Sequence, residues 1–154
     1  MVTRRAFTLI ELLVTVGILT LIAAFVTPTY QLVLSQLQLN SAVQEVAEHI
    51  RLAQQKTVSE QNIYGITFTA GSGSVPLFLY NPADGTKTTQ STISLPAYIT
   101  VNTVSFSGNS DIRFTTSGAP NYSGSLTIRD SVRSKSRTIE IRPSGTVITS
   151  SGEL

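Results

Sequence analysis

The chain of 154 residues contains no cysteine and a single histidine, His49. Without cysteine it can form neither disulfide bonds nor a thiolate metal site or nucleophile. One histidine cannot supply a histidine cluster for a metal, and no serine lies in the G-x-S-x-G context of a hydrolase nucleophile. We therefore expect no bound metal, no cofactor and no enzymatic activity.

Charge is also scarce, and its balance argues against a generally basic protein. The chain has eleven basic and nine acidic residues, and two of the basic ones are Arg4 and Arg5. The remaining nine basic residues equal the acidic ones in number. The basicity of the whole chain is therefore poor evidence for a polyanionic partner. From residue 112 to the end, however, the chain has six basic and three acidic residues.

A long apolar run occupies the N-terminal region. The twenty residues from Phe7 to Val26 contain one ionisable group, Glu11. A helix of this length measures about 30 Å, which matches the hydrocarbon core of a bilayer. A carboxylate in that core costs roughly 2.5 kcal/mol or more, so we expect Glu11 to have a function and a partner.

The residues around this run set its orientation. Arg4 and Arg5 precede it without any acidic residue, which predicts a cytoplasmic N-terminus and an extracytoplasmic chain after Pro28. A cleaved secretory signal would have an apolar stretch of about 7–15 residues, shorter than this one. A plain single-pass anchor fits the length but leaves Glu11 unexplained.

The segment Arg5-Ala6-Phe7-Thr8-Leu9-Ile10-Glu11-Leu12 resembles the class III signal of type IV pilins and pseudopilins. The resemblance implies cleavage between Ala6 and Phe7 by a prepilin peptidase, followed by N-methylation of Phe7. The family usually has glycine before the cut, and this chain has the small residue Ala6. Residues 1–6 are then a leader peptide, and the helix after it stays in the membrane.

The resemblance also implies a role for Glu11. After cleavage Phe7 bears a positive amine, and Glu11 lies one helical turn further on. In a filament, the carboxylate of one subunit can pair with the Phe7 amine of a neighbour. An unpaired charge is costly in a low dielectric, so this pairing favours a single axial register between subunits. The alternative is that Glu11 pairs with the amine of its own chain.

One long helix is predicted from Phe7 to Gln61, with a kink near Pro28. Its first part, 7–28, would be the transmembrane or filament-core segment, and 29–61 would be amphipathic. An apolar stripe in the second part follows alternating steps of four and three residues, which favours packing on the protein's own sheet over a coiled coil with a partner. We expect His49 to be a helix-surface or partly packed residue. The stripe comprises Leu39, Val43, Val46, Ile50, Ala53 and Thr57.

After Asn62 the composition shifts to threonine, serine, glycine and β-branched residues, which predicts a β domain over 62–154. Without intervening helices its strands should be antiparallel, so the fold class is α+β. The order of elements is similar to that of H-type minor pseudopilins and FimT-like minor pilins, which implies two sheets lying on the helix. Strands are predicted at 63–69, 75–80, 97–106, 110–115, 124–129, 137–142 and 145–149.

A basic cluster lies near the C-terminus. The resemblance implies a possible role for this cluster, because similar minor pilins can bind DNA during uptake through basic residues near the C-terminus. Phosphate contacts would give an affinity that falls with salt. The alternative is a solvated loop, and Asp130 and Glu140 reduce the positive charge. The predicted DNA contacts are Arg133, Lys135, Arg137 and Arg142.

These observations predict a minor pilin or pseudopilin, a structural subunit of a type II secretion pseudopilus or a type IV pilus-like filament. Its expected partners are other pilin subunits, the prepilin peptidase, an inner-membrane assembly platform and the membrane itself. Two alternatives remain open. One is a DNA-binding minor pilin acting in natural transformation, and the other is a membrane-anchored β domain that never polymerises.

Overall fold

The computed structural model describes residues 7–151, except for the side chains of 26–32 and 151. The predicted leader, including Ala6, lies outside the described residues. The chain divides into two compact units, 1–36 and 37–154. Helix α1 (Leu9–Glu60) contributes to both of them, and its 52 residues agree with the predicted helix.

Pro28 lies within α1, and the kink predicted there stays a prediction. Across the side chains that are described, no helix is long and apolar enough to cross a membrane. The transmembrane segment predicted for 7–28 therefore also stays a prediction.

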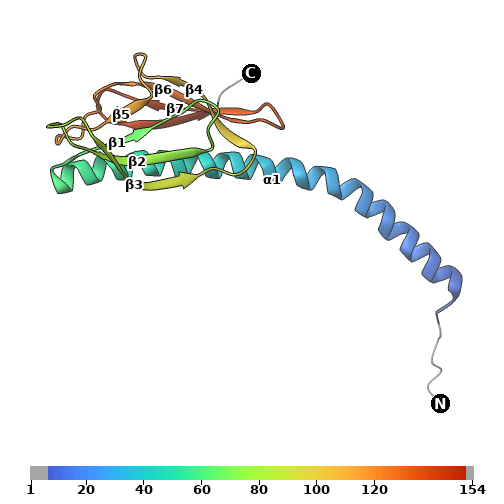
Figure 1. Ribbon diagram of the computed structural model, residues 1–154. Coiled ribbons are helices and arrows are strands. Elements are labelled where there is room, and N and C mark those ends of the chain that lie inside the picture. Colours follow the sequence, from blue (N-terminus) through green and yellow to red (C-terminus); the bar gives the residue numbers. More distant parts are fainter. Residues whose placement is uncertain (1–6, 152–154) are drawn as a thin grey trace. The chain divides into compact units, whose positions relative to one another are not determined.

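The β domain consists of two antiparallel sheets of four strands each among the described residues (Figure 1). The first has the order β3-β2-β1-β5 and the second the order β4-β6-β7-β8. The predicted α+β class with two sheets on a long helix is therefore confirmed. The strands are β1 (Ile63–Thr67), β2 (Ser74–Tyr80), β3 (Lys87–Ser94), β4 (Ile99–Ser105), β5 (Asp111–Arg113), β6 (Gly124–Asp130), β7 (Ser136–Ile141) and β8 (Val147–Ser151).

Strand β3 was not predicted, and its sequence explains why. It reads KTTQSTIS, and all of its side chains are exposed except that of Ile93, which is half-buried. The strand lies at the edge of its sheet and pairs only with β2 among the described strands. No apolar alternation marks a strand whose two faces both meet water, so the signal on which strand prediction depends is absent.

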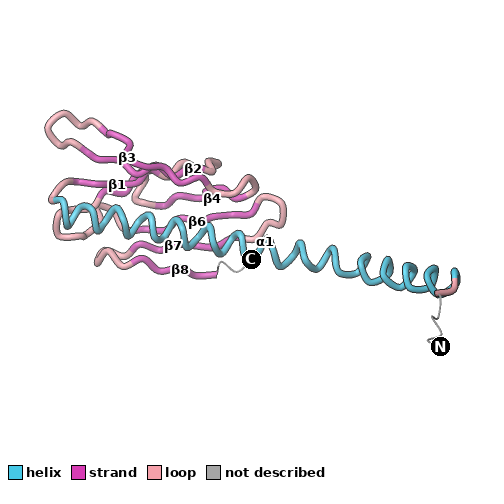
Figure 2. The backbone as a smooth tube through the Cα atoms, turned by 90° about the horizontal axis from the view of Figure 1, so that it is seen from below, coloured by secondary structure: helices cyan, strands magenta, loops and turns pink. Residues whose placement is uncertain are grey.

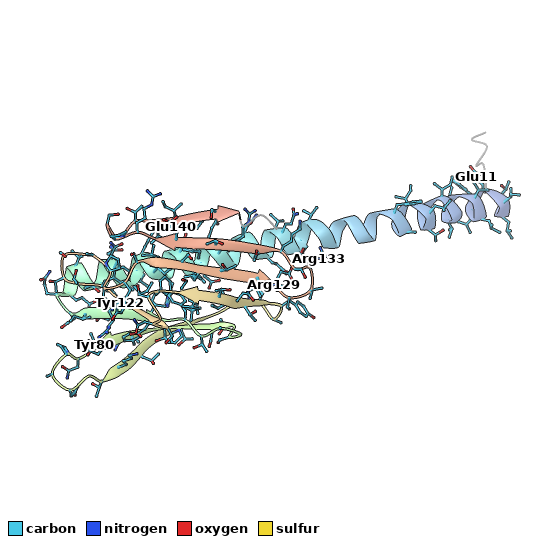
Figure 3. The ribbon with its side chains drawn as sticks, turned by 90° about the horizontal axis from the view of Figure 1, so that it is seen from above. Glu11, Tyr80, Tyr122, Arg129, Arg133 and Glu140 are labelled. Atoms are coloured by element: carbon cyan, nitrogen blue, oxygen red, sulfur yellow. The ribbon has the colours of Figure 1, made fainter. Side chains whose placement is uncertain are left out.

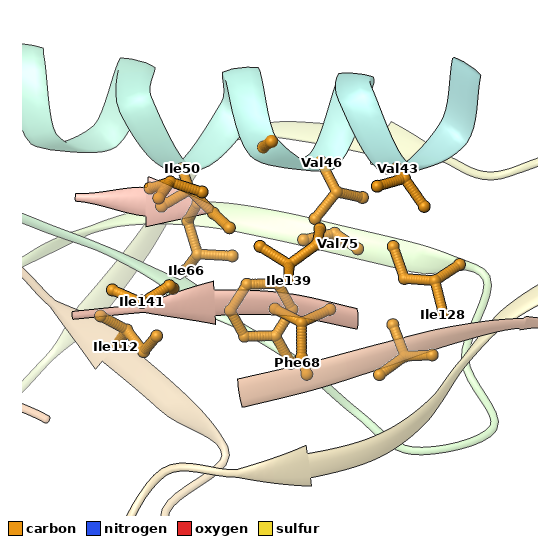
Figure 4. Packing of buried hydrophobic residues seen from close by; sticks show 14 of the residues in the cluster. Val43, Val46, Ile50, Ile66, Phe68, Val75, Ile112, Ile128, Ile139 and Ile141 are labelled. Atoms are coloured by element: carbon orange, nitrogen blue, oxygen red, sulfur yellow. The ribbon is translucent and has the colours of Figure 1, made fainter. Parts of the chain in front are cut away.

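The second half of α1 lies along the two sheets and shares one hydrophobic core with them (Figures 2 and 4). Every residue of the predicted stripe is buried, and so are Ala42 and Ala47 beside it. Val43, Val46 and Ile50 point toward the sheet residues Ile66, Ile128, Ile139 and Ile141 (Figure 4). The stripe therefore serves packing within the chain.

His49 is more deeply buried than expected, with 6% of its surface exposed. Its Nε2 atom has no hydrogen-bond partner among the described residues. This burial lowers the pKa of His49 from its ordinary value, and the charge of Glu45, one turn earlier, opposes the effect by a smaller amount. Burial therefore favours the neutral form of the imidazole in the folded protein.

This burial predicts a dependence of stability on pH. The unfolded chain binds a proton at His49 below the ordinary pKa of 6.5, whereas the folded chain binds it only at lower pH. The free energy of unfolding should therefore fall as the pH decreases from neutrality through this value. Urea unfolding at a series of pH values should show this slope, and His49→Leu should remove it. An identical slope in both proteins would contradict the assignment, because the chain has no second histidine.

Candidate functional site

Thr8 and Glu11 organise the start of α1. Thr8 precedes the helix, and its Oγ1 accepts a hydrogen bond of 3.3 Å from the backbone N–H of Glu11. A threonine followed by glutamate three residues later is the capping-box pattern, which satisfies backbone donors that the first turn leaves unpaired. The pattern Thr8-x-x-Glu11 is a sequence signal for this cap, which was not among the predicted features.

The capping bond uses the backbone of Glu11 and leaves its carboxylate available. Glu11 is exposed, and none of the hydrogen bonds or ion pairs of the described residues involves its carboxylate. A negative charge in the first helical turn also interacts favourably with the helix dipole. The side chain of Phe7, whose amine is the predicted partner, is 74% exposed.

The first part of α1 is apolar on all its sides. Every described residue from Phe7 to Phe25 is exposed, and most are large and apolar. A helix that is apolar all round needs an apolar environment, either a membrane or the interior of an assembly. The fully apolar surface and the available carboxylate occur on the same segment, which is the arrangement that the predicted assembly role requires.

The basic cluster does not form one surface. Arg133 and Lys135 belong to the loop 131–135 between β6 and β7, and Arg129 donates a hydrogen bond of 3.1 Å to Ser134 of that loop. Arg142 lies beyond the opposite end of β7, where it forms a 3.5 Å ion pair with Glu140. In Figure 3, Glu140 is well separated from Arg129 and Arg133.

Arg137 occupies a third environment. Arg137, Ile139 and Ile141 are spaced by two residues along β7 and therefore lie on the same face, the helix side of the sheet. There Arg137 lines a small polar cleft with Asn40 and Gln44 of α1. The structure therefore brings Arg133 and Lys135 together and places Arg137 and Arg142 elsewhere.

At the other end of the second sheet, Gln54 of α1 contacts two loops of the β domain. Its Nε2 donates a hydrogen bond of 2.7 Å to the carbonyl of Gly118, in the connection between β5 and β6. Gly145 lies in the turn between β7 and β8 with a φ of +82°, and a side chain there would collide with Gln54. The loop 131–135 and this turn thus mark opposite ends of the second sheet.

Among the described residues, no three His, Asp or Glu side chains lie close enough together to hold a metal ion.

Two family models match the sequence. The prokaryotic N-terminal methylation motif matches residues 1–27, and the type II transport protein GspH matches residues 42–145. A search of curated proteins gives no match.

Solved structures share the fold at low sequence identity. The minor pseudopilin EpsH from the type 2 secretion system of Vibrio cholerae is 9% identical with a TM-score of 0.61, and the match covers 74% of this chain and 97% of that one. The type IV minor pilin FimU of Pseudomonas aeruginosa is 14% identical with a TM-score of 0.61, and the match covers 75% and 90% of the two chains. Since the GspH model spans more than half of the sequence and follows a methylation motif, the chain belongs to the GspH family of type II transport proteins.

Proposed function

We propose that this chain is a minor pseudopilin or minor pilin, a non-enzymatic subunit of a type II secretion pseudopilus or a type IV pilus-like filament. The proposal rests on two features that occur together in this chain. A methylation motif opens a helix that is apolar on all sides, and a GspH-type β domain follows it. A subunit of this kind needs a segment for the filament core and a domain for the filament surface.

The chain would be inserted with its N-terminus in the cytoplasm and its β domain outside. A prepilin peptidase would then cut between Ala6 and Phe7, and methylation of Phe7 would follow. At the assembly platform the apolar helix would move from the bilayer into the filament, where it meets the helices of other subunits. The carboxylate of Glu11 would pair there with the Phe7 amine of a neighbour, because neither charge is tolerated alone in that environment.

Mass spectrometry of the intact protein tests the processing step. When the chain is produced together with an active prepilin peptidase, we expect the loss of residues 1–6 and the addition of one methyl group. A peptidase without activity should leave the chain at full length. An unchanged mass beside an active peptidase that processes a known pilin would contradict the proposal.

The alternative of a DNA-binding minor pilin has less support. Arg142 and the pair formed by Arg133 and Lys135 lie at opposite ends of β7, and Arg142 is already paired with Glu140. Among the described residues of the predicted contact, Arg133 and Lys135 alone share one loop, 131–135.

A further inference from the structure

Arg137 is a half-buried cation in a cleft between α1 and the strands β7 and β8. Among the described residues, no hydrogen bond, ion pair or ring contact involves its guanidinium group. The cleft is otherwise lined by amide and hydroxyl side chains and by one valine, without an acidic residue. A guanidinium group in such surroundings fits a carboxylate, with which arginine forms two parallel hydrogen bonds. The polar residues beside it are Asn40, Gln44, Thr149 and Ser150.

An acidic groove lies along the other flank of α1, beside β3. Its lining includes Glu45, Glu48, His49, Leu52 and Ile93. Both glutamates are exposed, and neither forms a hydrogen bond or an ion pair with another described residue. The Nε2 atom of the buried His49 also lacks a hydrogen-bond partner among the described residues. Two carboxylates and one imidazole nitrogen of a single groove therefore have no partner within the described chain.

The two flanks of α1 carry opposite charge. Arg51 also lines the acidic groove, but its guanidinium group donates to the carbonyl of Val147 in β8 at 3.4 Å, which turns it toward the flank of Arg137. Figure 2 shows β3 and β8 on opposite sides of α1. One side of the domain thus presents Glu45 and Glu48, and the other side presents two arginines. Surfaces of complementary charge favour association with each other.

We propose that the acidic groove of one copy of this chain binds the Arg137 cleft of a second copy, with Glu48 entering the cleft and pairing with Arg137. The contact gives a partner to charged groups that a single copy leaves unpaired. It rests on the proposed function and deepens it, because it names the surfaces through which the β domains of neighbouring subunits meet.

The contact would set a stagger between copies. Glu48 lies four residues beyond Gln44 and eight beyond Asn40 in α1, which is about 6–12 Å along the helix axis. Copies with parallel helices are therefore displaced along the axis when Glu48 of one enters the cleft of the other. Because the groove and the cleft are different surfaces, each copy keeps one of them for a further neighbour. Repetition of such a contact builds an open helical array.

Cysteine crosslinking tests the contact in the full-length protein. The natural chain has no cysteine, so Leu52→Cys in the groove and Thr149→Cys beside the cleft supply the two thiols of a double variant. Both positions are exposed. Membranes that contain the variant and an active prepilin peptidase are treated with a short bis-maleimide. Dimers, trimers and larger species should form in the double variant, and each single variant should form none of them.

Reversing one charge should lower the crosslinked fraction at least about tenfold, because like charges then meet. Glu48→Arg and Arg137→Glu are the two reversals, and Arg142→Glu, beyond the far end of β7, is the control without effect. A chain with Glu48→Arg and Leu52→Cys, produced beside a chain with Arg137→Glu and Thr149→Cys, should recover the heterodimer. Recovery would exclude misfolding as the cause of the loss, since both reversed chains take part in it.

The outcomes separate this proposal from the proposed function. If the chain is neither processed by the peptidase nor found in sheared filaments, the proposed function is wrong. If it is processed and enters filaments, but the double variant gives no crosslinked series or the reversed chains recover no heterodimer, only the contact between copies is wrong. Equal crosslinking of a single-cysteine variant would show a two-fold contact and would overturn the proposal. So would crosslinked species that contain another protein in place of a second copy, identified by mass spectrometry.

Discussion

Replacing Glu11 with glutamine should lower the incorporation of this subunit into filaments at least about 100-fold relative to the unaltered protein. In the proposed filament, the change would leave the Phe7 amine of a neighbour without a counter-charge in an apolar core. Removing one partner of a buried ion pair costs about 3–5 kcal/mol, because the other charge stays buried and unpaired. The measurement is the amount of each variant in sheared filaments relative to its amount in the membrane.

The glutamine variant is a fair test because it preserves the start of α1. The capping bond uses the backbone N–H of Glu11, and glutamine fits a capping box as well as glutamate does. Thr15→Val is the matched control, since its hydroxyl donates only to the carbonyl of Leu12 within the same helix, at 2.8 Å. Equal incorporation of the glutamine variant and the unaltered protein would show that Glu11 has no partner in a neighbouring subunit.

Replacing Gly124 with alanine should lower the free energy of unfolding by about 3 kcal/mol or more. Gly124 opens β6, and a methyl group there would overlap the backbone carbonyl oxygen of Ser105 on the paired strand β4. It would also lie 2.8 Å from the ring of Phe106, which is fully buried. Neither atom belongs to a flexible side chain, so the backbone of two strands must move.

Urea or thermal unfolding measures this effect, and Gly73→Ala is its control. At Gly73 the nearest atom to an added methyl group is the carbonyl oxygen of Ile99, at an ordinary contact distance of 3.6 Å. Its φ is not in the left-handed region, so alanine should be neutral there or slightly stabilising. Two variants of equal stability would show that β4 and β6 do not approach each other as closely as described.

The helix and most of the strands could be predicted because their apolar residues recur with the period of a helix or of a strand. The stripe from Leu39 to Thr57 has the period of a helix, and burial follows it along its whole length. Strand β3 was not predicted because it forms by pairing with β2 at the edge of a sheet. Its sequence, KTTQSTIS, indicates neither the pairing nor the edge position. The β-propensity of the residues predicts a strand poorly when both faces of the strand are exposed to solvent.

The site was predictable only where its residues are local in sequence. The motif around Phe7 and Glu11 is contiguous, so its resemblance to the class III signal is visible in the sequence, and the roles of the two residues stay predictions. The separation of Arg133 from Arg142 was harder to foresee, because both flank a strand of six residues. Residues at the two ends of such a strand lie about 17–20 Å apart or more, since each residue adds about 3.3 Å.

The hydrophilic edge formed by β3 has a consequence for how such subunits behave while they accumulate. An outer strand with unpaired backbone groups is a template on which another chain can add a strand, and apolar side chains would encourage it. The lysine, glutamine, serine and threonine side chains of β3 keep this edge of the sheet hydrated. The sequence of β3 therefore disfavours edge-to-edge pairing between the β domains of neighbouring copies.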